Sequence, residues 1–277
     1  MTPEDDPRST AVLVSVALAG LSNVEDDEEG WSAIHALRRR GTPEVVDSAV
    51  ALSRSSQAPS RALAAHLLGQ LGAEPRDELR ERCCADTLLS MLERESDDAV
   101  LAAIATEMGQ IADERVPSAV AHLARHANAE VRIGAVHALS RHNSPLAVSL
   151  LTELSRDVDE AVRDWATFGL GSLLEDVDTP ELREALMARL AEENLELQGE
   201  ALLGLAVRGD VRVVEPLREA LCAPVVNVLA VEAAATLRHP SLLPLLIALQ
   251  SRTGESDAYF ERSLSDAIAR LTSERTD

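Results

Sequence analysis

One short pattern recurs along the chain and constrains the fold more than any other feature. Its fullest copies read Val131-Arg132, Ala135, Leu139 and Val162-Arg163, Ala166, Leu170-Gly171. Weaker copies place the alanine position of each unit at residues 33, 64, 104, 135, 166, 201, 233 and 267. The successive spacings are 31, 40, 31, 31, 35, 32 and 34 residues. A near-constant period with the same internal motif indicates one supersecondary unit repeated about eight times.

Each unit is predicted to consist of two helices. Four units carry a helix-capping residue three positions before the Val position: Asp97, Asn128, Asp159 and Asn194. Such side chains accept hydrogen bonds from the free N–H groups of a first helical turn. Prolines begin the intervening segments at positions 43, 117, 145 and 180, where a missing N–H costs nothing. Residues 146–154 and 182–190 have the apolar spacing of helices, so we expect all-α units that bury their apolar faces only by stacking.

The pattern resembles that of the HEAT-repeat family, especially its short version in phycobilisome lyases. Residues 131–139 and 162–171 carry the resemblance best, and the pattern extends over residues 30–270. The family's arginine after the Val position is present at three positions and replaced at three others: Arg61, Arg132 and Arg163 against Leu101, Gln198 and Ala230. The resemblance implies a right-handed α-solenoid of the armadillo/HEAT type with about eight helix pairs.

The spacings also predict the domain organisation. We expect residues 1–277 to form a single domain of HEAT-like repeats, with the array over residues 8–274. The spacing of 40 residues adds an insertion near residues 72–82, and the spacing of 35 adds a longer turn near residues 175–180.

Composition supports helices and restricts the partner. The five aromatic residues are Trp31, Trp165, Phe168, Tyr259 and Phe260, and the apolar content is nearly all Ala, Leu and Val, which favours small-residue helix packing over sheets. The charge of the chain restricts its partners. The chain has no lysine, and it has 26 arginines and 47 carboxylates, which give a net charge of −21. This charge repels phosphate and so disfavours nucleic acids and anionic membranes, whereas it attracts a cationic protein. The alternative is that the acidity only keeps the chain soluble.

Cysteine content and the N-terminal segment favour the cytoplasm. Cys83, Cys84 and Cys222 provide no disulfide framework, because sequence neighbours rarely bridge each other. The apolar run over residues 11–21 follows acidic residues, where a signal peptide would be positive, and it is too short to span a bilayer. We therefore expect this run to be the first helix of the array.

Helical geometry predicts which side chains of the motif helices face away from the core. With the Val position as zero and about 100° per residue, positions 0, +4, +5 and +8 are nearly all apolar, which places the core near 60°. Position +6 then points away from the core, and it holds His35, His66, Thr106, His137, Phe168, Leu203 and Ala235. The family implies that these helices line a concave face.

We predict a partner-binding groove on this face. Its centre is Trp165, Phe168, Leu203 and Val207, its rim is Asp164, Glu200 and Glu232, and it extends to Ile133, His137, His66 and His35. Exposed Trp and Phe bury a large area at low entropy cost when a partner binds, so the cluster suits an apolar peptide or helix with basic flanks. The alternative for Trp165 and Phe168 is packing into the core between repeats, and for Trp31 a contact that caps the first repeat.

No catalytic, cofactor or metal site is predicted. Histidines 122, 126, 137 and 142 spread over roughly 20 Å of helix, and the column His35, His66 and His137 has a repeat spacing of about 10 Å, both too wide for one metal ion. HEAT-like deoxyhypusine hydroxylases bind iron through His-Glu pairs, and this chain has no His-Glu dipeptide. HEAT-like DNA glycosylases have a basic groove, whereas this one is acidic. Serine-hydrolase, phosphate-loop and dinucleotide motifs are also missing from the sequence.

Three functions remain open at this point. The first is a non-catalytic scaffold or adaptor that binds a protein or peptide along the groove, without nucleic acid, membrane or cofactor. The second, implied only by the shared repeat type, is an enzyme like the bilin lyases. The third is an immunity or inhibitor protein whose acidic face binds a basic toxin, which the net charge permits.

Overall fold

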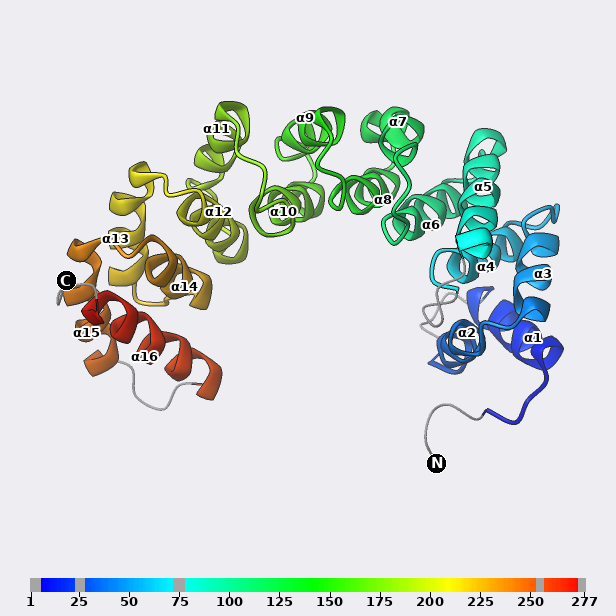
Figure 1. The fold of residues 1–277 in the computed structure, drawn as a ribbon, viewed down its shortest axis with the longest axis horizontal. Coiled ribbons are helices and arrows are strands. Elements are labelled where there is room, and N and C mark those ends of the chain that lie inside the picture. Colours follow the sequence, from blue (N-terminus) through cyan, green and yellow to red (C-terminus); the bar gives the residue numbers. More distant parts are fainter. Residues whose placement is uncertain (1–5, 23–27, 72–77, 253–256, 274–277) are drawn as a thin grey trace. The chain divides into compact units, whose positions relative to one another are not determined.

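The computed structural model describes residues 6–22, 28–71, 78–252 and 257–273, and all regular elements in these ranges are helical (Figure 1). The chain divides into two compact units, Met1–Leu146 and Ala147–Asp277. The described ranges contain sixteen α-helices, and in seven of the eight successive pairs the two helices pack closely on each other, which confirms the predicted all-α solenoid.

Unit 1 contains four helix pairs. Its helices are α1 (Thr10–Leu21), α2 (Glu28–Arg40), α3 (Pro43–Leu52), α4 (Ala58–Leu68), α5 (Glu78–Arg94), α6 (Asp98–Met108), α7 (Val116–Val120) with a 3₁₀ turn (Ala121–Arg125), and α8 (Ala129–Leu139). The motif helices α2, α4, α6 and α8 pack on one another in that order, and each also packs on the helix that precedes it. The core of the unit therefore lies between two layers of helices.

Unit 2 repeats this arrangement. Its helices are α9 (Pro145–Leu154), α10 (Glu160–Phe168) with a π-helical turn (Gly169–Leu173), α11 (Pro180–Arg189), α12 (Leu195–Val207), a 3₁₀ turn (Val211–Val213), α13 (Val214–Cys222), α14 (Val228–Leu237), a 3₁₀ turn (Pro240–Leu242), α15 (Leu243–Arg252) and α16 (Ala258–Ser273). The motif helices α10, α12, α14 and α16 pack in succession. Helix α9 begins two residues before the boundary of the unit.

The predicted helix starts are confirmed. Asp97, Asn128, Asp159 and Asn194 each cap a motif helix, and their side chains accept hydrogen bonds from backbone N–H groups of the first turn. Asn227 does the same for α14, one residue later in the repeat than expected. The four prolines lie in the first turn of α3, α7, α9 and α11.

The core positions follow the predicted helical phase. All eight residues of the alanine column are fully buried: Ala33, Ala64, Ile104, Ala135, Ala166, Ala201, Ala233 and Ala267. Small residues allow the motif helices to approach closely. A Cβ atom on Gly204 of α12 would lie 2.6 Å from the Cα atom of Gly171, so these backbones touch and glycine is required there.

The arginine after the Val position ties each motif helix to the loop before it. Arg61 donates to the carbonyl of Ser55, Arg132 to that of His126, and Arg163 to that of Asp157, at 2.8 to 3.1 Å. Gln198, which replaces the arginine in α12, makes an equivalent bond to the carbonyl of Leu190 at 2.9 Å. Each bond satisfies a loop carbonyl that helix formation leaves without a partner.

The sequence also predicted the first helix, an insertion and a longer turn. The run over residues 11–21 forms α1, as expected. Residues 72–77 of the predicted insertion lie outside the described ranges, and residues 78–82 begin α5, which has 17 residues against 10 in α3. Part of the insertion is therefore a longer helix. The predicted turn near residues 175–180 joins the π-helical turn to α11.

Candidate functional site

The predicted outward positions are less buried than the core positions, but they are not fully exposed. At position +6, His35 is exposed, Ala235 is buried, and His66, Thr106, His137, Phe168 and Leu203 are half-buried. At position +5, by contrast, every residue from Ile34 to Ala234 is buried. The motif helices lie side by side, so each one partly covers the outward side chains of its neighbours.

An aromatic pair on α10 is the clearest exposed feature of unit 2. The Trp165 side chain is 41% exposed and lies outside the core, whereas Phe168 is half-buried. Their ring centroids are 6.0 Å apart and the rings meet at 81°, an edge-to-face contact that aromatic pairs favour. Phe168 thus supports the Trp165 ring from one side while the ring still meets solvent.

Helix α12 continues this surface with apolar and acidic side chains. Glu200, Leu203 and Val207 follow one another at helical spacing and all three are half-buried, and α12 packs directly on α10. We call the surface formed by Asp164, Trp165 and Phe168 of α10 together with Glu196, Glu200, Leu203 and Val207 of α12 and Glu232 of α14 the Trp165 face.

The carboxylates of the Trp165 face disfavour one another's ionisation, because each negative charge raises the pKa of its neighbours. Burial raises the pKa of Asp164, and the charges of Glu196 and Glu160 raise it further. Burial also raises the pKa of Glu200; a hydrogen bond from the Ser172 hydroxyl at 2.6 Å opposes this shift, while Asp164, Glu232 and Glu196 add to it. No arginine in the described ranges forms an ion pair with Asp164, Glu196, Glu200 or Glu232, so a cation would relieve their mutual repulsion.

Helix α16 holds the carboxylate of Glu232 in place. The Tyr259 hydroxyl donates a hydrogen bond to Glu232 at 2.7 Å, and the Ser263 hydroxyl donates to the same oxygen at 3.3 Å. The hydrogen bond from Tyr259 to Glu232 and the negative charge of Glu232 raise the pKa of Tyr259. A third aromatic side chain therefore borders the acidic end of the surface, and Tyr259 itself is exposed.

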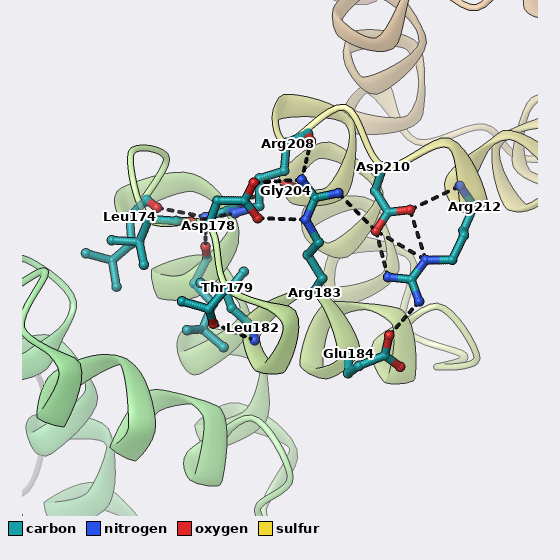
Figure 2. A network of polar contacts seen from close by, with 12 residues as sticks. Leu174, Asp178, Thr179, Leu182, Arg183, Glu184, Gly204, Arg208, Asp210 and Arg212 are labelled. Atoms are coloured by element: carbon teal, nitrogen blue, oxygen red, sulfur yellow. Dashed lines mark hydrogen bonds and ion pairs between the residues drawn. The ribbon is translucent and has the colours of Figure 1, made fainter.

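A buried arginine, Arg208, binds the backbone of the segment that follows Phe168 in the sequence (Figure 2). The Arg208 guanidinium donates five hydrogen bonds to main-chain carbonyls, those of Leu170, Gly171, Leu174, Val177 and Gly204, at 2.7 to 3.3 Å. Burial lowers its pKa. Because the π-helical turn leaves carbonyls outside the regular helical ladder, Arg208 supplies the donors that the turn itself lacks.

Two further arginines extend this network across unit 2 (Figure 2). Arg183 donates to Asp178 at 2.6 Å, to the carbonyl of Arg208 at 2.6 Å, and lies 3.3 Å from Asp210. Arg212 pairs with Asp210 and with Glu184. These contacts join helix α11 to the loop before it and to the loop that follows α12.

The candidates in unit 1 form two separate groups. Trp31 is 37% exposed, and its ring meets His66 at 5.2 Å and His35 at 6.5 Å between centroids. Ile133 and His137 lie one turn apart on α8 and are half-buried; burial lowers the pKa of His137. The structure therefore brings His35 and His66 together around Trp31, as in the contact suggested as an alternative for this residue.

His66 also belongs to a buried ionic cluster that the sequence did not indicate. The carboxylate of Glu107 on α6 accepts a hydrogen bond from Arg38 of α2 at 2.6 Å and one from Gln70 at 3.1 Å, and it lies 2.9 Å from Nδ1 of His66. The Glu107 side chain is only 5% exposed. This cluster joins three successive motif helices, so His66 has a packing role whatever else it contacts.

One residue of the Trp165 face, and one hydrogen-bond donor to it, were not predicted from the sequence. Glu196 lies one position before the Val position, at 260° on the same helical wheel, so extending the wheel by one residue would have found it. Ser172, which donates to Glu200, lies within the π-helical turn, where the regular helical phase no longer applies. Within the described ranges, no group of three or more His, Cys, Asp or Glu side chains is arranged to hold a metal ion.

None of the helices described here has both the length and the hydrophobicity needed to cross a bilayer. The cysteines Cys83, Cys84 and Cys222 are free thiols.

Comparison with known proteins identifies the repeat type. The family model for HEAT repeats matches residues 85–171. Protein YibA of Escherichia coli K12 is 33% identical over 116 residues, which are 42% of this chain and 41% of YibA, and YibA of Escherichia coli O157:H7 gives the same values. This sequence match spans about two-fifths of the length of the curated relative.

Solved structures extend the likeness to the fold of the whole chain. The X-ray structure of Escherichia coli YibA is similar with a TM-score of 0.72 at 22% identity, covering 97% of this chain and 98% of that one. The crystal structure of an engineered protein is similar with a TM-score of 0.54 at 17% identity, covering 98% and 82%. Identities this low are evidence of a shared fold and not of a shared activity.

Proposed function

We propose that this chain, whose residues 85–171 are HEAT repeats, is a non-catalytic cytoplasmic scaffold or adaptor that binds a protein or peptide with basic flanks. In unit 2 the proposed binding surface is the Trp165 face. In unit 1, taken by itself, the side chains around Trp31 and those of Ile133 and His137 are proposed as separate contact positions. One observation carries the proposal: the exposed Trp165 ring adjoins carboxylates that lack a cationic partner within the described ranges.

The aromatic pair supports an apolar anchor. Trp is enriched among the residues that dominate binding energy, because it buries a large area and has few rotatable bonds. The Trp165 ring packs edge-to-face against Phe168, so part of its conformational freedom is already lost before a partner covers it.

The carboxylates support basic flanking residues in the partner. An arginine or lysine placed beside Asp164 and Glu200 would lower their raised pKa values and replace repulsion by attraction. The net charge of −21 would steer such a partner toward the chain. A basic toxin bound at the same face would make the protein an inhibitor, which is a more specific form of the same proposal.

The test uses an amphipathic helical peptide with an apolar stripe and arginine flanks, together with a version that has glutamate flanks. The chain has two tryptophans, so the variant Trp31→Phe leaves Trp165 as the only indole reporter. We expect the basic peptide to change Trp165 fluorescence, and we expect Trp165→Ala to weaken its binding about 30-fold, as for the loss of an interface hot spot.

A charge-matched pair of variants separates the rim from the net charge. Asp164→Asn with Glu200→Gln removes two carboxylates of the Trp165 face, whereas Glu193→Gln with Glu219→Gln removes two exposed carboxylates elsewhere in unit 2. Only the first pair of substitutions should weaken binding of the basic peptide. Equal binding of both peptides, or an absorbance shift on mixing the protein with a bilin, would contradict a non-catalytic acidic docking surface.

A further inference from the structure

A recess in unit 1 has the opposite charge from the rest of the chain. It lies between the end of α3 and one face of α5 and encloses about 360 Å³. The residues that line it are Ser53, Arg54, Arg82, Cys83, Asp86, Thr87, Ser90 and Arg94. Three of the eight are arginines, in a chain with 26 basic residues against 47 carboxylates.

The spacing along α5 makes the recess elongated. Arg82, Asp86, Ser90 and Arg94 recur every four residues on one helix face, and twelve residues of helix span about 18 Å. At one end, Arg94 donates to the carbonyl of Ser53 at 3.1 Å and to the Ser90 hydroxyl at 3.5 Å. Arg54 follows Ser53 directly, so two guanidinium groups belong to this end and Arg82 to the other.

The positive charge of the recess is not neutralised from within. The only carboxylate of its lining, Asp86, pairs with Arg115, which lies outside the lining, at 2.8 Å. In the described part of the chain, Arg54, Arg82 and Arg94 form no ion pair with a carboxylate. Arg115 is shared between Asp86 and Asp113, and the charge of Arg82 helps to lower the pKa of Asp113. The three guanidinium groups of the lining still outnumber its one carboxylate.

We propose that this recess binds a small phosphorylated molecule, with one phosphate between Arg54 and Arg94 and a second anionic group near Arg82. Guanidinium groups bind phosphate through paired, charge-assisted hydrogen bonds, and the Ser90 hydroxyl adds a donor at the same end. A volume of about 360 Å³ suits a small organic ligand better than a folded partner. The surrounding negative charge repels anions only weakly here, because salt screens it beyond about 8 to 10 Å.

The probes are inorganic phosphate and fructose 1,6-bisphosphate, titrated calorimetrically into the full chain at an ionic strength of about 0.1 to 0.15 M, where the net charge of the chain is screened. The variant Arg54→Gln with Arg82→Gln removes two lining charges that make no hydrogen bond within the described ranges, so the fold should be unaffected. The control, Arg156→Gln with Arg270→Gln, removes two exposed arginines of unit 2. We expect the bisphosphate to bind more tightly than phosphate and to lose at least about tenfold in the first variant only.

Thiol labelling tests where the ligand binds, by a measurement that does not depend on calorimetry. Cys83 lines the recess and is exposed, Cys222 is exposed elsewhere, and Cys84 is buried. The bisphosphate should slow modification of Cys83 and leave Cys222 unchanged. Failure of both probes to bind, equal losses in both variants, or tighter binding of an acidic peptide that displaces the bisphosphate would each overturn the proposal.

Discussion

Arg208 allows the cost of one side chain to be worked out from its contacts. Its guanidinium donates to five carbonyls, whereas the lysine of Arg208→Lys has three N–H donors and keeps the charge. At least two carbonyls then lose their donor. Each buried acceptor left without a partner costs about 1–3 kcal/mol, and Leu174 keeps a second bond from the N–H of Val177, so we expect a loss of about 2–4 kcal/mol.

The assay must be local, because repeat arrays do not always unfold as one unit. Hydrogen exchange of peptides covering residues 169–178 should become faster in Arg208→Lys, and the urea midpoint of unfolding should fall. The control Arg156→Lys changes an exposed arginine of the same unit and should alter neither. If exchange over residues 169–178 matched that of the unaltered chain, the five bonds would not stabilise the turn and the reasoning would be refuted.

Three further changes test the packing and the charges. Gly204→Ala places a Cβ 2.6 Å from the Cα of Gly171 and should cost about 1–3 kcal/mol in thermal unfolding; an unchanged Tm would mean that the helices separate without cost. Glu107→Gln removes the charge from a buried ion pair and should lower the free energy of unfolding in urea by about 3–5 kcal/mol; an unchanged urea midpoint would contradict a stabilising role for this ion pair. The Arg212 side chain lowers the pKa of Asp210 to about 2 from 3.8, so about 2 kcal/mol of stability present at pH 7 should disappear as the pH falls from about 4 to 2. Asp210→Asn should therefore lose this much at pH 7 and nothing near pH 2, and a constant difference across that range would contradict the assignment.

The sequence was informative wherever a rule is local and periodic. The alanine column, the capping residues and the prolines each depend on spacing within one helix, so the helix pairs and the buried face could be predicted from positions such as Ala135 and Asn128. The outward direction was predicted less well. His66 lies at the expected angle, yet it joins Glu107 and Arg38 from neighbouring helices, and a wheel drawn for one helix contains no information about its neighbours.

The remaining features depend on contacts that no helical period describes. The π-helical turn after Phe168 shifts the phase of the chain, and Arg208 reaches it from about forty residues away. The recess along α5 likewise combines Arg54 with Arg82 and Arg94 from a different helix. Such groups come together only when the helices are placed in space. This explains why an exposed position for Trp165 could be considered from the sequence, whereas the arginine recess could not.

The hydrogen bonds between loop and helix have a consequence for how the array can change in length. Arg61, Arg132 and Arg163 each bond a carbonyl six residues upstream, within their own repeat. Duplicating or deleting a complete repeat of this kind would separate none of these arginines from its upstream carbonyl, although Arg61 and Arg163 would exchange the carboxylates that they contact in the next repeat, Glu95 and Glu192. Arg208 is different, because its acceptors Leu170 and Leu174 belong to the repeat before its own. These two repeats must therefore be duplicated or deleted together if the bonds between them are to be kept.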